Sequence, residues 1–289
     1  MMNDVIIKFY KADGESFTIS RGGEWRFLKK GLSGFGLASG SLSYSDNVMG
    51  DGGEIKNVRL TRVDRTVKAV YMIPTANSQA RQSFLKFFRI RETYKVVLSY
   101  MGVTRWAEGI LYKLQMSEKL DDDLLLNATM TFAFANPLWK SMDNFGKDIA
   151  AVTETAGFPW LSPIGVGTPA GVFNFSREVI LSNDGDVVSY PSIIITAKDD
   201  VLNPIIRIND AFVKINDAMT EGDTITLNLG ALPPRVEKNG VNYFGHADKT
   251  SQFNKMYLDL GDNTVSFDAD DGSDNLAVTV YYNKMYTVI

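Results

Sequence analysis

The sequence predicts a mainly β protein with one α-helix, divided into an N-terminal β domain and a C-terminal β-sandwich. Three observations predict this class. Apolar and polar residues alternate through much of the chain, turn-forming residues recur about every ten positions in its second half, and a single segment carries apolar residues at helical spacing. With 289 residues, 45% of them hydrophobic, the chain can bury the core of one large or two ordinary domains.

The N-terminal unit is predicted over residues 1–140 as an antiparallel sheet. Its strands are expected in residues 1–10, 58–63, 66–71, 94–100, 104–116 and 124–134. Turns between them are expected at Asp64-Arg65, at Met101-Gly102 and at the acidic residues 121–123. Because these connections are too short for parallel crossovers, neighbouring strands should run antiparallel.

One amphipathic helix is predicted at about residues 77–90. Asn77 is a good N-cap, and four apolar side chains then fall on one helix face, namely Ala80, Phe84, Phe87 and Phe88. The opposite face carries the basic residues Arg81, Lys86 and Arg89. We expect the apolar face to cover the sheet and the three basic residues to be candidate interface residues.

Residues 141–171 are rich in proline and glycine and show no sustained periodicity. A segment of this length without regular structure is uncommon inside a compact domain, so it is predicted to be a linker or an arm that packs against a neighbour. Its aromatic residues Phe158 and Trp160, with Trp139 just before it, are further candidate interface residues.

The remaining residues, 172–289, are predicted to form the β-sandwich. Strands are expected in residues 172–181, 192–197, 205–209, 212–215, 224–229, 263–268 and 276–282. Turn signals separate them, including Asn239-Gly240 and Asp271-Gly272. Many short strands without an intervening helix are typical of a sandwich.

Composition restricts the chemistry that the chain can perform. The absence of cysteine excludes disulfides, thiol nucleophiles and thiolate metal sites, and His246 is the single histidine. The net charge of −4 conceals an asymmetry, because residues 1–140 carry a net charge of +6 and residues 141–289 one of −10. The two halves are therefore expected to face different surroundings, and their complementary charge could aid docking between subunits.

No catalytic, cofactor or metal site is predicted. Asp248 could orient His246 as a base, but no nucleophile motif accompanies the pair, although Ser251 is near in sequence. The acidic run at residues 268–274 lacks the glycine and glutamate of an EF-hand loop and is interpreted as a solvated hairpin tip. Two alternatives stay open: a carbohydrate-binding module that contacts the host cell envelope, and an enzyme acting on cell-wall polymer.

No export or membrane signal is found. The apolar residues near the N-terminus form too short a run for a signal peptide, and no window approaches the roughly 18 apolar residues that a membrane-spanning helix needs.

A series of short motifs, taken together, resembles a known family. The N-terminal unit ends on Met130-Thr131-Phe132-Ala133-Phe134 followed by Ala135-Asn136-Pro137-Leu138-Trp139-Lys140. The C-terminal unit carries, in order, Asn183-x-Gly185-Asp186-x-x-x-x-Pro191-x-Ile193-Ile194-Ile195, Asn203-Pro204, Gly222-Asp223-x-Ile225-x-Leu227, Asn239-Gly240-Val241-Asn242, Leu260-Gly261-Asp262-Asn263-x-Val265 and Val278-x-Val280-Tyr281-Tyr282. Their order, with one helix among N-terminal strands, resembles the distal tail (Dit) proteins of siphophages.

The resemblance implies a fold and a structural role. It implies an N-terminal domain of split-barrel, tail-tube-like shape and a galectin-like C-terminal sandwich. Six copies would form a ring at the virion tail tip, after assembly in the cytoplasm of the bacterial host. The implied partners are further copies of the chain, the tail tube protein, a tail-associated or tail-fibre hub protein and receptor-binding baseplate proteins. DNA would pass through the ring without specific binding, and no catalysis, cofactor or membrane anchor is implied.

Overall fold

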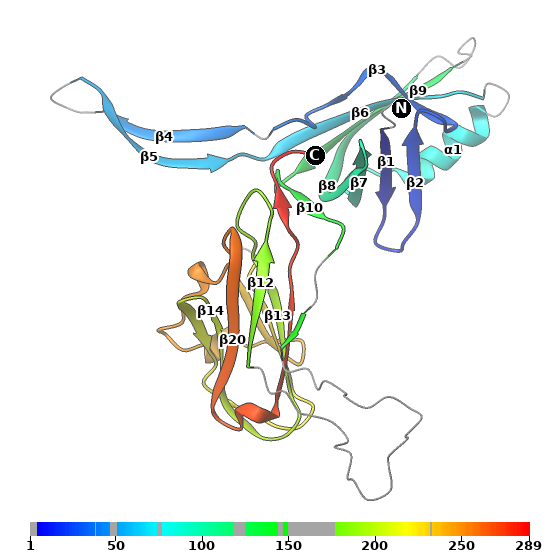
Figure 1. Ribbon diagram of the computed structural model, residues 1–289. Helices are drawn as coiled ribbons and strands as arrows, with labels where there is room; N and C mark the ends of the chain where they lie inside the picture. The colour runs from blue at the N-terminus through cyan, green and yellow to red at the C-terminus, as the bar shows by residue number, and fades with distance from the viewer. Residues whose placement is uncertain are drawn as a thin grey trace, which may run out of the picture. The chain divides into compact units, whose positions relative to one another are not determined.

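A computed structural model describes residues 5–37, 39–46, 51–73, 77–117, 125–143, 147–149, 177–231 and 233–289. The chain is mainly β with one α-helix, which confirms the predicted fold class (Figure 1). It divides into two compact units, here called unit 1 (residues 1–142 and 285–289) and unit 2 (residues 143–284). The predicted linker or arm at residues 141–171, with Phe158 and Trp160, lies largely outside the described residues.

Unit 1 is built on one antiparallel sheet with the order β2-β1-β7-β8-β9-β6-β3 (Figure 1). Two short strands extend it, because β10 pairs with β8 and β22 pairs with β10. The strands are β1 (Ile6–Tyr10), β2 (Ser16–Ser20), β3 (Trp25–Ser33), β6 (Val63–Tyr71), β7 (Thr93–Tyr100), β8 (Val103–Met116), β9 (Leu126–Phe134), β10 (Trp139–Ser141) and β22 (Met285–Tyr286). Antiparallel pairing, predicted from the short connections, is confirmed.

Helix α1 (Asn77–Phe87) closes the core of unit 1, as its apolar face predicted. Phe84 and Phe88 are buried and lie with ring centroids 4.6 Å apart. Phe84 also contacts the ring of Trp25 at 4.5 Å, and Phe88 contacts that of Phe9 at 5.2 Å. This aromatic cluster joins the helix to strands β1 and β3, so the helix is fixed by packing rather than by its intrinsic propensity.

The helix ends at Phe87, three residues before the predicted end at residue 90. Tyr94, buried on β7, stops it. Its hydroxyl donates to the Phe87 carbonyl at 2.9 Å and accepts from the Arg89 amide at 2.8 Å. Burial raises the pKa of Tyr94 to about 12, so the hydroxyl keeps the proton that this bond needs. The chain then turns at Arg91, whose φ of 76° is incompatible with a continuing helix.

The predicted break between strands at Asp64-Arg65 is wrong. Strand β6 runs without interruption from Val63 to Tyr71 and pairs with β9 along its whole length. The break lies three residues earlier, at Thr61 and Arg62, after a strand that ends at Leu60. A polar pair resembles a turn in sequence, but here the Arg65 side chain is buried in the core, which sequence alternation cannot reveal.

The C-terminal residues return to unit 1. Residues 285–289, which the sequence places with the sandwich, cluster with the N-terminal strands. Tyr286 lies opposite Trp139 in the β10–β22 pair and under the Arg105 guanidinium, 3.5 Å from its ring centroid. Arg105 also donates to the Val288 carbonyl, and Ile289 packs on the core. In chain order, unit 2 is therefore an insertion between β10 and β22.

Deleting residues 285–289 should destabilise unit 1. The deletion removes the β22 pairing, the Arg105–Tyr286 stack and the packing of Ile289. Losses of this kind are worth about 1–3 kcal/mol in the free energy of unfolding. Urea denaturation of the full chain and of the shortened chain, followed by tryptophan fluorescence, measures the effect. Identical midpoints would show that the C-terminal strand contributes nothing to unit 1.

Unit 2 is a sandwich of two antiparallel sheets with the orders β11-β21-β13-β17-β18-β19 and β12-β20-β14-β15, β16 pairing with β14. The strands of the first sheet are β11 (Lys147–Ile149), β13 (Ser192–Ala197), β17 (Thr224–Asn228), β18 (Arg235–Lys238), β19 (Val241–Asn242) and β21 (Leu276–Tyr281). Those of the second are β12 (Glu178–Asn183), β14 (Val201–Ile208), β15 (Ala211–Lys214), β16 (Ala218–Met219) and β20 (Gly261–Asp271).

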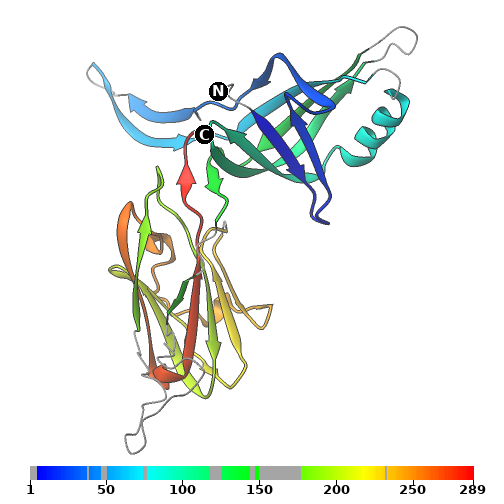
Figure 2. The ribbon, with the colours of Figure 1, turned by 45° about the vertical axis from the view of Figure 1, so that its right-hand side comes forward.

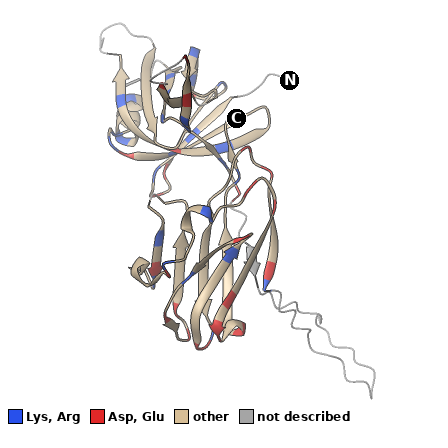
Figure 3. Ribbon diagram, turned by 90° about the vertical axis from the view of Figure 1, so that its left-hand side faces the viewer, with Lys and Arg blue, Asp and Glu red and all other residues tan. Residues whose placement is uncertain are grey.

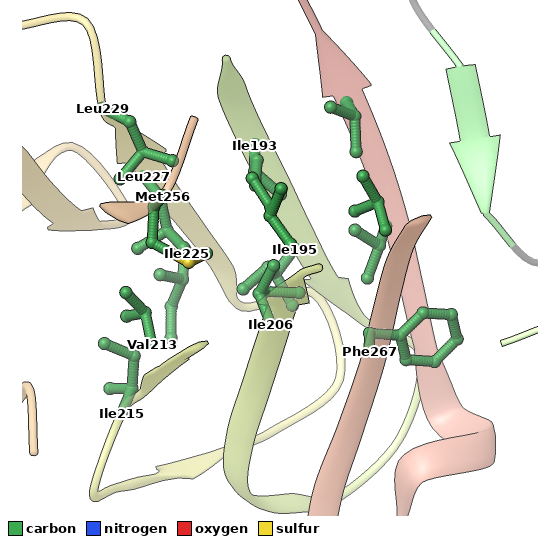
Figure 4. Packing of buried hydrophobic residues seen from close by; sticks show 14 of the residues in the cluster. Ile193, Ile195, Ile206, Val213, Ile215, Ile225, Leu227, Leu229, Met256 and Phe267 are labelled. Atoms are coloured by element: carbon green, nitrogen blue, oxygen red, sulfur yellow. The ribbon is translucent and has the colours of Figure 1, made fainter. Parts of the chain in front are cut away.

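The core of unit 2 consists of alternate side chains from both sheets (Figure 4). Ile193 and Ile195 of the first sheet lie near Ile206 of the second, and Phe267 packs beside them. Their spacing of two along each strand is the alternation that predicted the sandwich. The strand expected at residues 192–197 is confirmed with the same bounds.

Two buried asparagines hold the loops of unit 2. Asn183 donates to the carbonyls of Val187 and Leu258 and accepts from the Gly185 amide. Asn263 donates to the carbonyls of Asp259 and Gly261. Both belong to the motifs that carried the family resemblance, so at these two positions the motifs fix the geometry of loops.

Among the described residues, no helix is long and apolar enough to span a membrane.

Candidate interaction surfaces

A β-hairpin, here called the arm, extends from unit 1 beyond the sheet (Figures 1 and 2). It consists of β4 (Gly40–Asp46) and β5 (Gly53–Leu60), which pair only with each other among the described strands. At its root the Thr61 amide donates to the Ser39 carbonyl at 3.0 Å. The described side chains of both strands are almost all exposed.

The arm has one apolar face that nothing in the described chain covers. Leu42 lies opposite Val58, and Tyr44 lies opposite Ile55. Between 61% and 69% of each of these four residues is exposed, and Leu60 extends the same face toward the root. A contiguous apolar face of this kind is a candidate binding surface.

A β-bulge keeps the face continuous. The register shifts between Ser43 and Tyr44, so that Lys56 is an extra residue on β5. Without the bulge, strand alternation would direct Ile55 and Val58 to opposite faces. With it, both point the same way, while the other face presents serines of β4 and polar residues of β5. The bulge therefore separates an apolar face from a polar one along the whole arm.

A groove of about 720 Å³ lies at the opposite end of unit 1. It runs between the edge strands β2 and β3, with residues of β6 and α1 along its side. The two edges share no backbone hydrogen bonds in the described ladder, and the side chains of Phe17 and Trp25, 5.9 Å apart, bridge them instead. The sheet is thus an open barrel whose gap is bordered by two unpaired edges.

The basic residues predicted for the helix surface lie where the periodicity placed them. Lys86 and Arg89 are exposed, and the Arg89 guanidinium lies 3.8 Å from Glu92. Arg81 is half-buried and donates to the Ser117 carbonyl at 3.0 Å. These three side chains lie on or just after one helix, but they do not share a common partner. An exposed ion pair such as Arg89–Glu92 contributes little to stability.

Trp139 is fully buried, so it belongs to the core of unit 1 in the isolated chain. Its ring stacks on the Arg65 guanidinium at 4.1 Å, and the ring of Phe134 lies on the other side at 4.2 Å. Arg65 is 1% exposed and donates to the Pro137 carbonyl at 2.7 Å. Burial lowers the pKa of Arg65 to about 10. Among the described residues, Arg65 Nη1 and Trp139 Nε1 have no hydrogen-bond partner.

The His246 region is not arranged for catalysis. The His246 ring stacks flat on Tyr243, 3.8 Å between centroids, while Asp248 accepts bonds from Thr250 and Asn216. Ser251 bonds the Lys214 backbone. Within the described ranges, no three His, Asp or Glu side chains are grouped to hold a metal ion.

The acidic run at residues 268–274 is locally neutralised. Lys214 bonds both carboxylate oxygens of Asp270 at 2.7–2.8 Å, and Arg177 bonds Asp274 at 2.7 Å. Acidic and basic residues are scattered along the strands of both units (Figure 3). The net charge of each half therefore does not correspond to a patch of one sign in this region.

Acidification should destabilise unit 2 below about pH 4. Hydrogen bonds from Thr250 and Asn216 lower the pKa of Asp248 to about 2, and bonds from Lys214 and Asn203 lower that of Asp270. In the unfolded chain these carboxylates titrate near pH 3.9, so their stabilisation is present above that value and is lost as the pH falls toward 2. Melting temperature by circular dichroism from pH 6 to 2 checks this. Asp248→Asn should flatten the profile, whereas Asp210→Asn, at an exposed loop aspartate, should not.

The comparisons with known proteins concern both units. Residues 184–286 match the model of the family described as Siphovirus-type tail component, C-terminal domain. The chain carries a siphovirus-type tail component domain. Over these residues the match confirms the predicted resemblance to siphophage Dit-type tail components. No match to a curated protein was found.

Solved structures extend the likeness to the whole length of this tail component. The crystal structure of SPP1 Dit, described as a paradigm of the hub adsorption apparatus in phages that infect Gram-positive bacteria, has a TM-score of 0.62 at 14% identity. The match covers 96% of this chain and 98% of that chain. A chain of the phage P2 baseplate, in its activated conformation with Ca, gives 0.53 at 14% identity and covers 98% and 99%. These likenesses establish that both units share the Dit fold.

The sequence did not predict the arm or the groove. Strands β3 and β4 lie in the part of the chain that was left without elements, and β5 was predicted only in its last residues. A usable signal existed in the alternation of Leu42 and Tyr44 with serines, opposite Val58 and Ile55. Whether such a strand is half-buried or uncovered is not encoded in the alternation itself.

Proposed function

We propose that this tail component is a structural hub protein at the virion tail tip, where six copies form a ring. The ring joins the tail tube to the tail-associated or tail-fibre protein and to receptor-binding baseplate proteins, and DNA passes through it. The shared fold with SPP1 Dit and with a chain of the P2 baseplate supports this role. The protein performs no catalysis and acts through its surfaces alone.

The arm is the observation that carries the proposal. A two-stranded hairpin is marginally stable in water, and this one exposes an apolar face instead of burying it. With roughly 100 Å² exposed on each of five side chains, that face covers about 500 Å², near the upper limit of the largest patch on a monomer. Such a surface is stable in the virion only if another protein chain covers it.

Ring closure satisfies the same requirement at the sheet edges. Strands β2 and β3 each pair on one side only within the described sheet, and open edges promote aggregation unless a partner covers them. In a closed ring every copy has the same neighbours, so no surface of this kind is left at an end. This property distinguishes a ring from an open filament.

The mass of the purified protein in solution tests the proposal. Light scattering or native mass spectrometry should find a species near six times 32.1 kDa, alone or after addition of the tail tube protein. A monomer at the highest soluble concentration, with and without the tube protein, would contradict the ring.

The mass of the assembled species at low and high salt tests the role of charge. If the opposite charges of the two halves aid docking, assembly should weaken as salt rises.

A further inference from the structure

We propose that the apolar face of the arm docks into the groove between β2 and β3 of a second copy of the chain. This inference rests on the proposed function, because it specifies the contact by which the ring forms. The occupant of the groove is thus a segment of this same protein. Four observations carry the argument: the position of the arm, the lining of the groove, the unpaired edges and the difference between the two surfaces.

The register of β3 and β6 shows that the arm cannot reach its own groove. These strands pair over their length, with Trp25 opposite Tyr71 at one end and Ser33 opposite Thr66 at the other. Trp25 and Tyr71 line the groove, whereas the arm begins just beyond Ser33. At about 3.3 Å per residue, the strand pair alone separates the two sites by roughly 25 Å.

The arm continues in the direction away from the groove. It leaves unit 1 at the end opposite to α1 in both views (Figures 1 and 2). The seven residues of β4 add roughly 20 Å to the separation between the groove and the arm tip. Only the groove of another copy can receive it.

The lining of the groove fits an incoming apolar strand. Small residues, among them Gly23, Ala80 and Ser83, leave space. Ile73, which is 40% exposed, offers apolar surface beside the nearly buried rings of Trp25 and Tyr71 at the floor of the groove. The arm presents the complementary set, because Leu42, Tyr44, Ile55 and Val58 are bulky, exposed and on one face of the hairpin. Large side chains from one surface then enter space left by small ones on the other, as in a packed core.

The unpaired edges add polar complementarity. β2 hydrogen-bonds only to β1, and β3 only to β6, in the described sheet. Their outer edges therefore present backbone donors and acceptors on both sides of the groove. The arm strands also have free outer edges, since β4 and β5 pair only with each other in the described chain. Strand addition between such edges is a recurrent mode of recognition.

The arm and the groove are two different surfaces of one chain. A contact between unlike surfaces is head-to-tail, and repeated around an axis it closes into a ring or continues as a filament. A dimer with matching faces would require arm against arm, which leaves the groove and both sheet edges uncovered. The arrangement on this chain therefore favours the arm-into-groove contact over arm pairing.

Cysteine cross-linking tests the contact, and a chain without native cysteine suits it. Two single variants of the full-length protein are mixed: Tyr44→Cys on the apolar face of the arm, and Ser83→Cys, exposed on the groove side of α1. A short bismaleimide should link them into dimers in high yield. The matched control replaces the groove cysteine with Thr104→Cys, an exposed residue at the start of β8, and should link at least tenfold less. Cross-linking of the Tyr44→Cys variant alone measures arm–arm contact, and cross-linking of the Ser83→Cys variant alone measures groove–groove contact.

A second experiment uses a substitution that fills the groove. Ser83→Trp should abolish assembly by occupying the space, whereas Gln82→Trp, the adjacent exposed helix residue, should assemble as the unaltered chain does. An assembled ring in which Tyr44→Cys links no better to Ser83→Cys than to Thr104→Cys would overturn the inference and leave the proposed function intact. A chain that stays monomeric, without any cross-link, would overturn both. Linkage of Tyr44→Cys to itself would assign the arm to an arm–arm contact and also overturn the inference.

Discussion

Val58→Asp should abolish ring assembly and leave the fold of the single chain unchanged. Val58 lies on β5 in the middle of the apolar face, opposite Leu42, and 64% of it is exposed in the isolated chain. A carboxylate there is solvated in the monomer and costs nothing. In an assembled contact it would be buried without a partner, at a cost of several kcal/mol at each interface. Because a closed ring repeats that cost at every contact, the assembled species should disappear at micromolar concentration.

The matched control is Asn57→Asp. Asn57 is the preceding residue, pairs with Ser43 and faces the polar side of the arm. The two variants change the charge by the same amount on the same strand and differ only in the face that carries it. Light scattering should find a monomer for the first variant and the assembled mass for the second, with equal melting temperatures. Assembly of the Val58→Asp chain, or equal loss in both variants, would show that the apolar face does not form the contact.

The alternation of apolar and polar residues predicted where strands form, but not whether their apolar faces are buried or exposed. Residues 192–197 and 94–100 were predicted as strands and are strands, and both are buried on one face. Val58-Arg59-Leu60 has the same alternation, yet its apolar side chains are exposed. A period of two fixes which side chains share a face. It does not say whether that face meets a core, another subunit or water.

The burial of two aromatic and charged residues was not predicted from the sequence, for a different reason. Trp139 was selected as an interface residue because it precedes a proline- and glycine-rich segment, and the structure places it in the core. Arg65 was assigned to a turn because it is charged, and it is among the most buried side chains of unit 1. The two residues contact each other. Neither position can be found from composition, since each depends on a neighbour about seventy residues away in the chain.

Arg65→Ala should produce the largest loss of stability in unit 1. The guanidinium fills the space between the rings of Phe134 and Trp139 and bonds the Pro137 carbonyl. Truncation to alanine leaves a cavity between two aromatic rings and an unpaired carbonyl, at a cost of about 3–5 kcal/mol in the free energy of unfolding. Urea denaturation followed by tryptophan fluorescence measures it, and a loss below about 1 kcal/mol would mean that the rings close over the gap.

Arg65→Met separates packing from charge at the same position. Methionine fills much of the volume between the rings but carries neither the charge nor the hydrogen bonds. Burial lowers the pKa of Arg65 to about 10, below its value in the unfolded chain, so burial of the charged form is unfavourable at neutral pH. The unpartnered Nη1 adds to that cost. Removing a buried charge together with its desolvation cost is often neutral. We therefore expect Arg65→Met to lose about 1–2 kcal/mol, clearly less than Arg65→Ala. Equal losses in the two variants would show that the charged stack itself, and not the filled volume, stabilises the junction of β6, β9 and β10.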